Sequence, residues 1–250
     1  MLFDNHRTTF RLLGREPILL SSAARRLAVL ERTIQVDLPA AVREWYSLEG
    51  ASELLTLEGD LYFQPWTIEE NTKNLRQRLR EQRPLWWVIG DYSSGVCFTA
   101  ELAAGIDPVV HCLETDGSVI DSGDEWSERS FSAFAFTCCW HQRQEGTVSL
   151  FGTEPSFSPP HLDVLMESFD EGPHVLREDA PRERRNPFTD QRMVATRFQF
   201  FFFSPEGLVQ LRSREDPRVS TTEVRWELFG TDKSALQALA SRLKQCGVIS

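Results

Sequence analysis

The sequence predicts an α+β fold: a central antiparallel sheet flanked by helices, with a C-terminal β-β-β-α extension or small second domain. Three observations predict it. Apolar residues recur at helical spacing over residues 21–50, short apolar runs separated by turn residues fill residues 85–120, and three more strand-like runs precede a last helical stretch. Short strands joined by short turns favour antiparallel pairing, and helices must cover the apolar face of such a sheet.

Two amphipathic helices are expected near the N-terminus. Residues 21–36 follow the candidate cap Ser22 and place one apolar face at Ala23, Leu27, Leu30 and Ile34. Pro39 opens the second helix, because a proline in the first turn removes an N–H that would have no partner there. Gly50 is placed to end that helix in a left-handed conformation.

A third helix and the sheet follow. Either Thr67 or Asn71 is the candidate cap of a charged helix over residues 68–83, which Pro84 stops. Four strands are then expected at residues 85–89, 96–100, 109–113 and 118–120. A helix over residues 131–140, capped by Ser130, supplies an apolar stripe that covers the sheet.

These elements predict three regions: an α+β domain at residues 1–141, a proline-rich linker or arm at 142–190 with a short helix near 162–169, and a β-β-β-α module at 191–250. Nearly every residue of 198–203 is apolar, so we expect protein on both faces of that strand. The strands of the module are expected at 196–203, 208–212 and 223–229, and its helix at Thr231 or Asp232 to Gly247.

Composition limits the classes of partner. The formal net charge of −10 repels the phosphates of nucleic acids and anionic lipid surfaces and attracts a basic protein, although acidity that only maintains solubility explains it equally well. We therefore expect no nucleic acid and no membrane as partner. The charged N-terminus and the lack of a long apolar run predict a cytoplasmic protein. Five cysteines, an odd and sparse set, predict buried thiols in a reducing compartment rather than disulfides.

The residue pattern gives no positive case for an enzyme, a cofactor or a metal site. Cys138, Cys139 and His141 are chemically suitable as zinc ligands or a nucleophile. Adjacent cysteines on a helix point about 100° apart, however, and no second pair at metal-ligand spacing accompanies them. Nucleophile-elbow and phosphate-loop motifs do not occur in the sequence.

An acidic run is the candidate partner-binding site. Residues 114–128 contain no Lys or Arg and hold six carboxylates beside Trp126, and a basic partner would relieve the repulsion among them. The alternative is a solvated loop with a packed tryptophan. The candidate residues are Glu114, Asp116, Asp121, Asp124, Glu125, Trp126 and Glu128.

Four motifs over residues 21–141 resemble the SUKH superfamily, which comprises Smi/Knr-type cell-wall regulators of fungi and bacterial immunity proteins. They are the Leu38-Pro39 helix that leads to Glu49-Gly50, the strand and turn at 87–95, the proline-valine strand at 108–111, and the serine-phenylalanine helix start at 130–134. Glu49-Gly50-Ala51 stands where the family has asparagine-glycine-glycine, and the last hundred or so residues lie outside the resemblance.

The resemblance implies a non-enzymatic binding module. One role it implies is an immunity protein that neutralises a polymorphic toxin by direct binding, through the acidic and aromatic surface, to a basic toxin domain. The other is an intracellular regulatory scaffold or adaptor that recruits other proteins.

Overall fold

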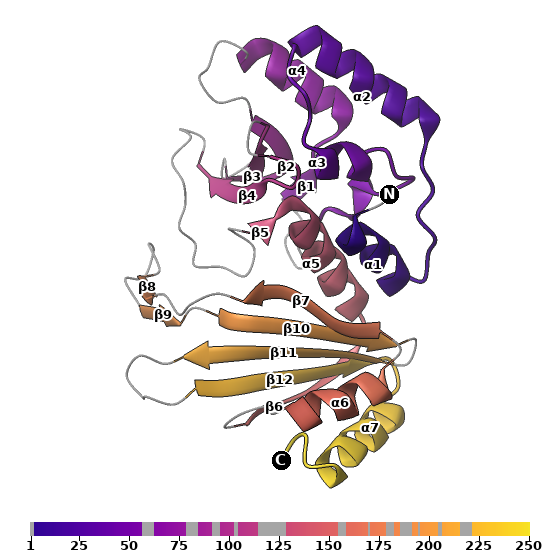
Figure 1. The fold of residues 1–250 in the computed structure, drawn as a ribbon, viewed down its shortest axis with the longest axis vertical. Coiled ribbons are helices and arrows are strands. Elements are labelled where there is room, and N and C mark those ends of the chain that lie inside the picture. The colour runs from indigo at the N-terminus through magenta and orange to yellow at the C-terminus, as the bar shows by residue number, and fades with distance from the viewer. Residues whose placement is uncertain are drawn as a thin grey trace. The chain divides into compact units, whose positions relative to one another are not determined.

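The computed structural model describes residues 3–56, 63–78, 85–91, 96–102, 105–114, 129–154, 159–169, 171–178, 183–185, 192–194, 196–204, 207–215 and 222–250. The chain forms two compact units, Met1–Arg143 and Gln144–Ser250 (Figure 1). Both units combine helices with antiparallel sheets, so the predicted α+β fold with a second C-terminal sheet is confirmed. Among the described residues, none of the helices has the length and apolar character needed to span a bilayer.

The first unit holds a five-stranded antiparallel sheet in the order β1-β2-β3-β4-β5. Its strands are β1 (Phe63–Pro65), β2 (Leu85–Asp91), β3 (Cys97–Glu101), β4 (Val109–Leu113) and β5 (Arg129–Ser130). The strand expected at 118–120 lies outside the described residues. The helices are α1 (Asp4–Leu12), α2 (Ser21–Ile34), α3 (Ala40–Trp45), the 3-10 turn η1 (Ser52–Leu54), α4 (Ile68–Arg78) and α5 (Phe131–Gln144).

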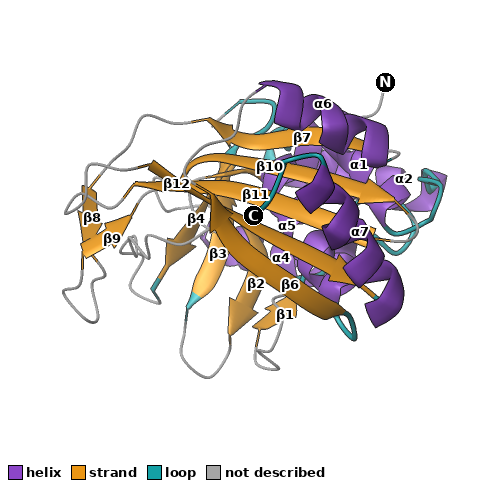
Figure 2. Ribbon diagram, turned by 90° about the horizontal axis from the view of Figure 1, so that it is seen from below, coloured by secondary structure: helices purple, strands orange, loops and turns teal. Residues whose placement is uncertain are grey.

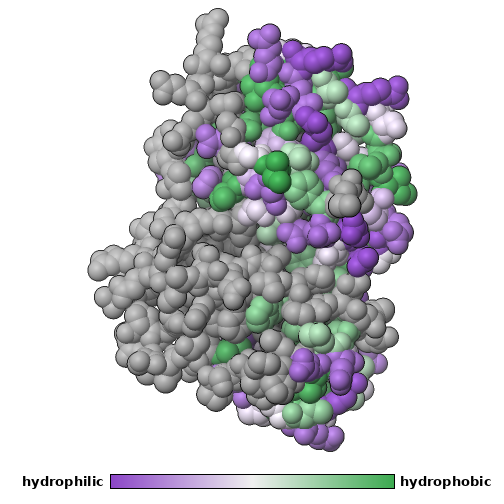
Figure 3. All heavy atoms as spheres, in the orientation of Figure 1, coloured by the Kyte–Doolittle hydropathy of each residue, from purple (hydrophilic) through white to green (hydrophobic). Residues whose placement is uncertain are grey.

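Helix α2 buries the apolar face that the sequence predicts and turns mostly hydrophilic side chains outward (Figure 3). Its start differs from the prediction, because Ser22 lies inside the first turn and Leu20 precedes the helix without a side-chain cap. The helix ends at Gln35, which takes up the left-handed conformation at φ 55° without the help of a glycine.

Helix α3 is shorter than predicted and stops at Trp45. The backbone beyond it bonds to the segment before α2 instead: Leu20 N donates to Ser47 O at 2.8 Å, and Glu49 N donates to Ile18 O at 2.9 Å. These long-range bonds compete with the local helical ones, so the helix gives way to a turn. Gly50 still adopts the predicted left-handed conformation, with φ 67°.

Of the two candidate caps of α4, Thr67 is the one that caps. The Glu70 N–H donates to Thr67 Oγ1 at 3.1 Å and Thr67 N donates to Glu70 Oε2 at 2.8 Å, which is a reciprocal capping box. Asn71 is instead fully buried inside the helix. Its Oδ1 accepts a hydrogen bond from Trp87 N at 2.8 Å, and its Nδ2 donates one to Trp87 O at 2.9 Å.

Asn71 thereby holds the backbone of β2 beside an irregularity in the strand. The pairing of β2 with β3 skips a residue between Trp87 and Ile89. A bulge of this kind leaves backbone groups without their ladder partners, and a buried group without a partner is costly. The two bonds from Asn71 supply partners to the backbone of Trp87, the residue before the skipped Val88.

Helix α5 is buried far more completely than a single stripe would require. The ten residues 131–140 are all buried, including Phe131, Phe134, Phe136 and Trp140. Its start agrees with the predicted cap, because Ala133 N donates to Ser130 Oγ at 3.4 Å. The residue run is apolar on all sides, which is typical of a helix enclosed by protein.

The second unit contains a five-stranded antiparallel sheet in the order β6-β12-β11-β10-β7 and a separate hairpin of β8 and β9. Helices α6 and α7 both cover one face of the larger sheet (Figures 1 and 2). The elements are β6 (Val148–Glu154), α6 (Pro159–Ser168), β7 (Glu171–Glu178), β8 (Glu183–Arg185), β9 (Arg192–Val194), β10 (Thr196–Ser204), β11 (Gly207–Glu215), β12 (Thr222–Gly230) and α7 (Lys233–Gln245).

The structure corrects the linker expected at 142–190. This stretch supplies both edge strands of the second sheet and one of its two covering helices. Its prolines are compatible with that role, because Pro159 and Pro160 lie in the first turn of α6 and Pro173 lies in the edge strand β7. At such positions the missing N–H removes no necessary hydrogen bond.

The core of the second unit lies between its sheet and its helices. Asp232 caps α7, accepting from Ser234 N at 2.7 Å and Ala235 N at 3.1 Å, which decides between the two predicted starts. Phe201, Phe202 and Phe203 are all buried, so β10 has buried side chains on both faces, as predicted. The core residues are Leu165, Phe169, Phe202, Val209, Trp226, Leu228, Leu236, Ala240, Leu243, Val248 and Ile249.

Candidate protein-binding site

The acidic run begins where strand β4 ends. Leu113 is buried as the last residue of β4, and Glu114, the next residue, is exposed. The other candidate residues lie outside the described part of the chain, namely Asp116, Asp121, Asp124, Glu125, Trp126 and Glu128. The described part of the chain resumes at Arg129, the first residue of β5.

Both ends of the run are attached to neighbouring strands. β4 and β5 pair antiparallel, with Val109 opposite Ser130 and Val110 opposite Arg129. β5 is also the last strand of the sheet. Glu114, which follows β4, and Arg129, which begins β5, therefore lie at the ends of two paired strands.

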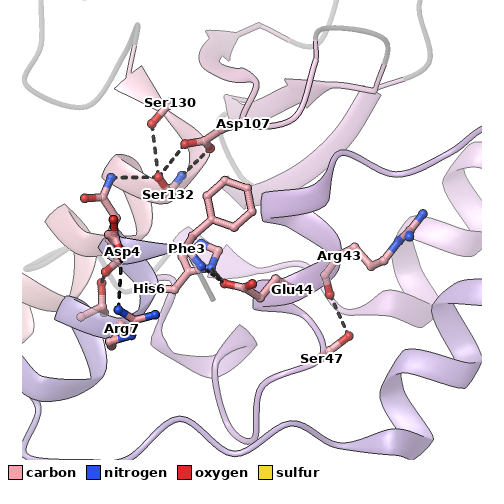
Figure 4. A network of polar contacts seen from close by, with 12 residues as sticks. Phe3, Asp4, His6, Arg7, Arg43, Glu44, Ser47, Asp107, Ser130 and Ser132 are labelled. Carbon is pink, nitrogen blue, oxygen red and sulfur yellow. Dashed lines mark hydrogen bonds and ion pairs between the residues drawn. The ribbon is translucent and has the colours of Figure 1, made fainter. Parts of the chain in front are cut away.

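A compact polar cluster holds the junction between β5 and α5 in place. Asp107 accepts from Ser132 N on Oδ1 at 2.9 Å and from Ser132 Oγ on Oδ2 at 2.6 Å. Phe131 N donates to Pro108 O at 2.7 Å, and Ser130 Oγ lies 3.4 Å from Ser132 Oγ. Figure 4 shows Ser130, Ser132 and Asp107 converging at the start of the helix. This cluster clamps the strand-to-helix junction on one side of the acidic run.

Helix α1 joins the same cluster. Asn5 Nδ2 donates to Ser132 Oγ at 2.9 Å, although the two residues are 127 positions apart. Ser132 is 1% exposed, so this hydroxyl both donates to Asp107 and accepts from Asn5 inside the protein. A buried hydroxyl with both capacities used is stabilising, whereas the loss of one partner would leave a buried polar group unpaired.

A partly buried acid–base pair, His6 and Glu44, lies next to this cluster (Figure 4). His6 is completely buried, and its Nδ1 lies 2.7 Å from Glu44 Oε1, which also accepts from Phe3 N at 2.8 Å. The imidazole packs against Trp45 at 5.0 Å and Phe131 at 6.2 Å between ring centroids. His6 Nε2 is buried without a hydrogen-bond partner.

The sequence pattern does not predict this pair, because no local spacing links a histidine in α1 to a glutamate 38 residues later. A carboxylate that orients an imidazole is an arrangement used in general-base catalysis. In this pair aromatic rings enclose the imidazole, and a general base must reach the proton that it removes. The geometry fits a tether that holds α1 and the N-terminal segment on α3.

The Cys139 thiol, two residues before His141, is held in its neutral form. Burial raises the pKa of the Cys139 thiol far above its usual range and outweighs the opposing charge of Arg15. A thiol must lose its proton to act as nucleophile or metal ligand. Within the described ranges, no three or more His, Cys, Asp or Glu side chains gather as metal ligands would. Cys97, Cys112, Cys138 and Cys139 are buried as expected, whereas Cys246 is exposed, contrary to that expectation.

Trp66 and Trp87 form an aromatic pair. Trp66 lies in the segment before α4, and Trp87 lies in β2. Their ring centroids are 4.6 Å apart, and a Cβ at Gly90 would lie 2.8 Å from Trp66 Nε1. The glycine lets the indole lie directly on the strand. Trp87 is therefore half-buried by packing, while its neighbour Trp86 is completely buried on the other face.

Comparisons with known proteins, by family models, by curated sequences and by solved structures, each found no match to this chain.

Proposed function

We propose that the chain is a non-enzymatic protein-binding module that acts as an immunity protein of the SUKH type, neutralising a basic toxin domain through the acidic run. The observation that carries the proposal is the concentration of six carboxylates and Trp126 in residues 114–128 without a single Lys or Arg. The ends of this run are attached to two paired strands, and one of them is clamped by the Asp107–Ser132 cluster.

The negative charge of the acidic run favours a basic partner. Carboxylates crowded in one segment repel one another, and a basic surface relieves that repulsion while long-range attraction raises the rate of encounter. An aromatic side chain among charges is typical of an interface anchor, since it buries a large area in a pocket of the partner. A rigid attachment lowers the entropy lost when the complex forms.

Charge reversal tests the site directly. The triple variant Asp121→Lys, Asp124→Lys and Glu125→Lys is expected to bind the toxin encoded beside its gene at least about 100-fold more weakly, mostly through slower association. Surface plasmon resonance at several salt concentrations measures the association rate. The wild-type rate should fall as salt rises, and the variant should lose most of that dependence.

The matched control reverses three exposed acids elsewhere: Asp37→Lys, Asp163→Lys and Glu167→Lys. It changes the net charge by the same amount while leaving the run intact, so it should retain most of the affinity. An equal loss of affinity in both triple variants would show that net charge matters and the acidic run does not, which contradicts the proposal.

A regulatory scaffold or adaptor is the second candidate, and the separate second unit favours it. Residues 144–250 form a compact unit with a core of their own, outside the segment that resembles the SUKH superfamily. An additional unit gives an adaptor a second surface for recruitment. Affinity capture of the full chain from its native cell, analysed by mass spectrometry, separates the two roles: a single toxin supports the immunity protein, and several cellular proteins without a toxin support the adaptor.

A further inference from the structure

The edges of the two five-stranded sheets differ in a way that points to self-association. A sheet edge presents unpaired N–H and C=O groups, and proteins usually protect it with short strands, prolines, bulges or charges. In the first unit, β1 has three residues and ends in Pro65, and β5 has two residues. Within the part of the chain that the structure describes, both of these edges are short.

In the second sheet, the edge strand β7 is protected against pairing with another strand, whereas the edge strand β6 is regular. Strand β7 contains Pro173, carries charges at Glu171, Arg177 and Glu178, and shifts register twice against β10. Strand β6 has none of these features along residues 148–153. It pairs with β12 over seven consecutive residues without a register shift.

The side chains of β6 are also unusually apolar for an exposed edge. Phe151 is 69% exposed and Val148 is 40% exposed. The Arg225 guanidinium lies 5.7 Å from the centroid of the Phe151 ring, which favours one position of the ring on the sheet surface. The one charge of the strand, Glu154, is occupied within the unit, because its Oε1 accepts from Trp226 Nε1 at 3.2 Å and from Ser250 N at 2.5 Å.

We propose that β6 pairs antiparallel with β6 of a second copy of this chain, which joins two five-stranded sheets into one continuous sheet across a two-fold axis at Phe151. A self-complementary edge is what a two-fold interface requires. In this register Phe151 faces its own copy, Ser149 faces Thr153, Leu150 faces Gly152 and Val148 faces Glu154. None of these pairs places like charges opposite each other, and the central pair is aromatic, which stabilises neighbouring strands.

Substitution of Phe151 tests the interface in solution. The full chain is expected to sediment as a dimer at high concentration and to dissociate on dilution. Phe151→Lys places two like charges opposite each other beside Arg225, so the dissociation constant should rise by about tenfold or more. The matched control Met166→Lys changes an apolar side chain that is 49% exposed on α6, and it should leave the constant unchanged.

Cysteine cross-linking tests the register independently of the lysine variant. In a Cys246→Ser background, which removes the exposed native thiol, Phe151→Cys should form a disulfide-linked dimer under mild oxidation, because directly opposite Cβ atoms lie about 5 Å apart. Ser149→Cys in the same background should not, since its two copies are offset by about 13 Å along the strands. A wild-type chain that stays monomeric at all concentrations overturns the proposal. So do a Phe151→Lys dimer of unchanged affinity and equal cross-linking by both cysteines.

Salt separates this inference from the proposed toxin complex. Two copies that each carry a net charge of −10 repel each other, so added salt should strengthen the dimer or leave it unchanged. Binding of a basic toxin should weaken under the same conditions. The lysine triple variant of the acidic run, which abolishes the proposed toxin site, should still dimerise.

Discussion

At the scale of the single residue, the side chain of Asn71 supplies hydrogen-bond partners to the backbone of β2. Its side-chain amide accepts from Trp87 N and donates to Trp87 O, one residue before Val88, which the β2–β3 pairing skips. A side chain of this shape matches the peptide group, with one acceptor and one donor side by side.

Asn71→Ala should therefore lower the free energy of unfolding by about 3 kcal/mol, because it removes both bonds to a buried backbone. Urea denaturation followed by tryptophan fluorescence measures the loss. Asn74→Ala, on the same helix, leaves both bonds in place and should change the free energy by less than about 0.5 kcal/mol. Equal effects of the two substitutions would contradict the role assigned to Asn71.

Cys139 makes stability depend on alkaline pH. Burial raises the pKa of this thiol in the folded chain, while the unfolded chain releases the proton near pH 8.5. Above that pH the unfolded state binds fewer protons than the folded state, so the free energy of unfolding falls as pH rises. Burial also raises the pKa of Tyr46, which adds a similar loss above about pH 10.

The variant Cys139→Ala should unfold with a shallower alkaline slope than the wild type, by up to about 1.4 kcal/mol per pH unit. Denaturation curves at pH 7 to 10 measure the slope. Cys246→Ala removes an exposed thiol and should keep the wild-type slope. An unchanged or steeper slope after Cys139→Ala would show that the buried thiol does not lower stability at alkaline pH.

Sequence patterns predict residue roles only where the partner is near in the chain. The caps Ser130 and Asp232 follow from positions within three residues of their partners. The pairing of His6 with Glu44 and of Asn5 with Ser132 depends on how distant segments meet, which no local spacing encodes. For the acidic run the structure gives the position of Glu114 and the attachment of both ends, and the partner stays a prediction.

At the scale of the element, a close approach between β6 and β12 explains a glycine inside a strand. A Cβ at Gly152 would lie 2.5 Å from Cζ2 of Trp226, so the indole ring occupies the space of a side chain. Gly152→Ala forces the ring to shift and should cost about 1–3 kcal/mol of stability. Thr153→Ala, at the exposed neighbouring position, serves as the control.

The double variant Gly152→Ala with Trp226→Phe tests the cause. A smaller ring at position 226 gives room to the added methyl group, so the cost of Gly152→Ala should shrink in that background. Thermal unfolding of the four chains of the cycle measures the coupling. Strictly additive effects would show that the contact with Trp226 does not explain the glycine.

The positions of the helices and central strands were easier to predict from the sequence than the part that residues 142–190 play in the fold. Periodic apolar residues identify α2, α5 and the strands β10 to β12, because those patterns follow from which side chains are buried. The stretch 142–190 misleads, since its prolines and charges suggest a linker while its backbone supplies two edge strands. Edge strands tolerate prolines and charges that central strands exclude, so composition alone does not separate them from a linker.

At the scale of the whole molecule, the core of the second unit defines where an independent domain begins. Its residues span Leu165 to Ile249, and Leu150 of β6 packs against them. We expect residues 144–250 to fold alone, with a cooperative transition worth about 5 kcal/mol or more, as is usual for about a hundred residues. The shorter fragment 191–250 lacks β6, β7 and α6 and should stay unfolded, because it loses Leu165 and Phe169 from the core. Circular dichroism during urea denaturation compares the two. Cooperative unfolding of 191–250 would place the boundary where composition alone puts it, and a non-cooperative 144–250 fragment would show that its core does not suffice.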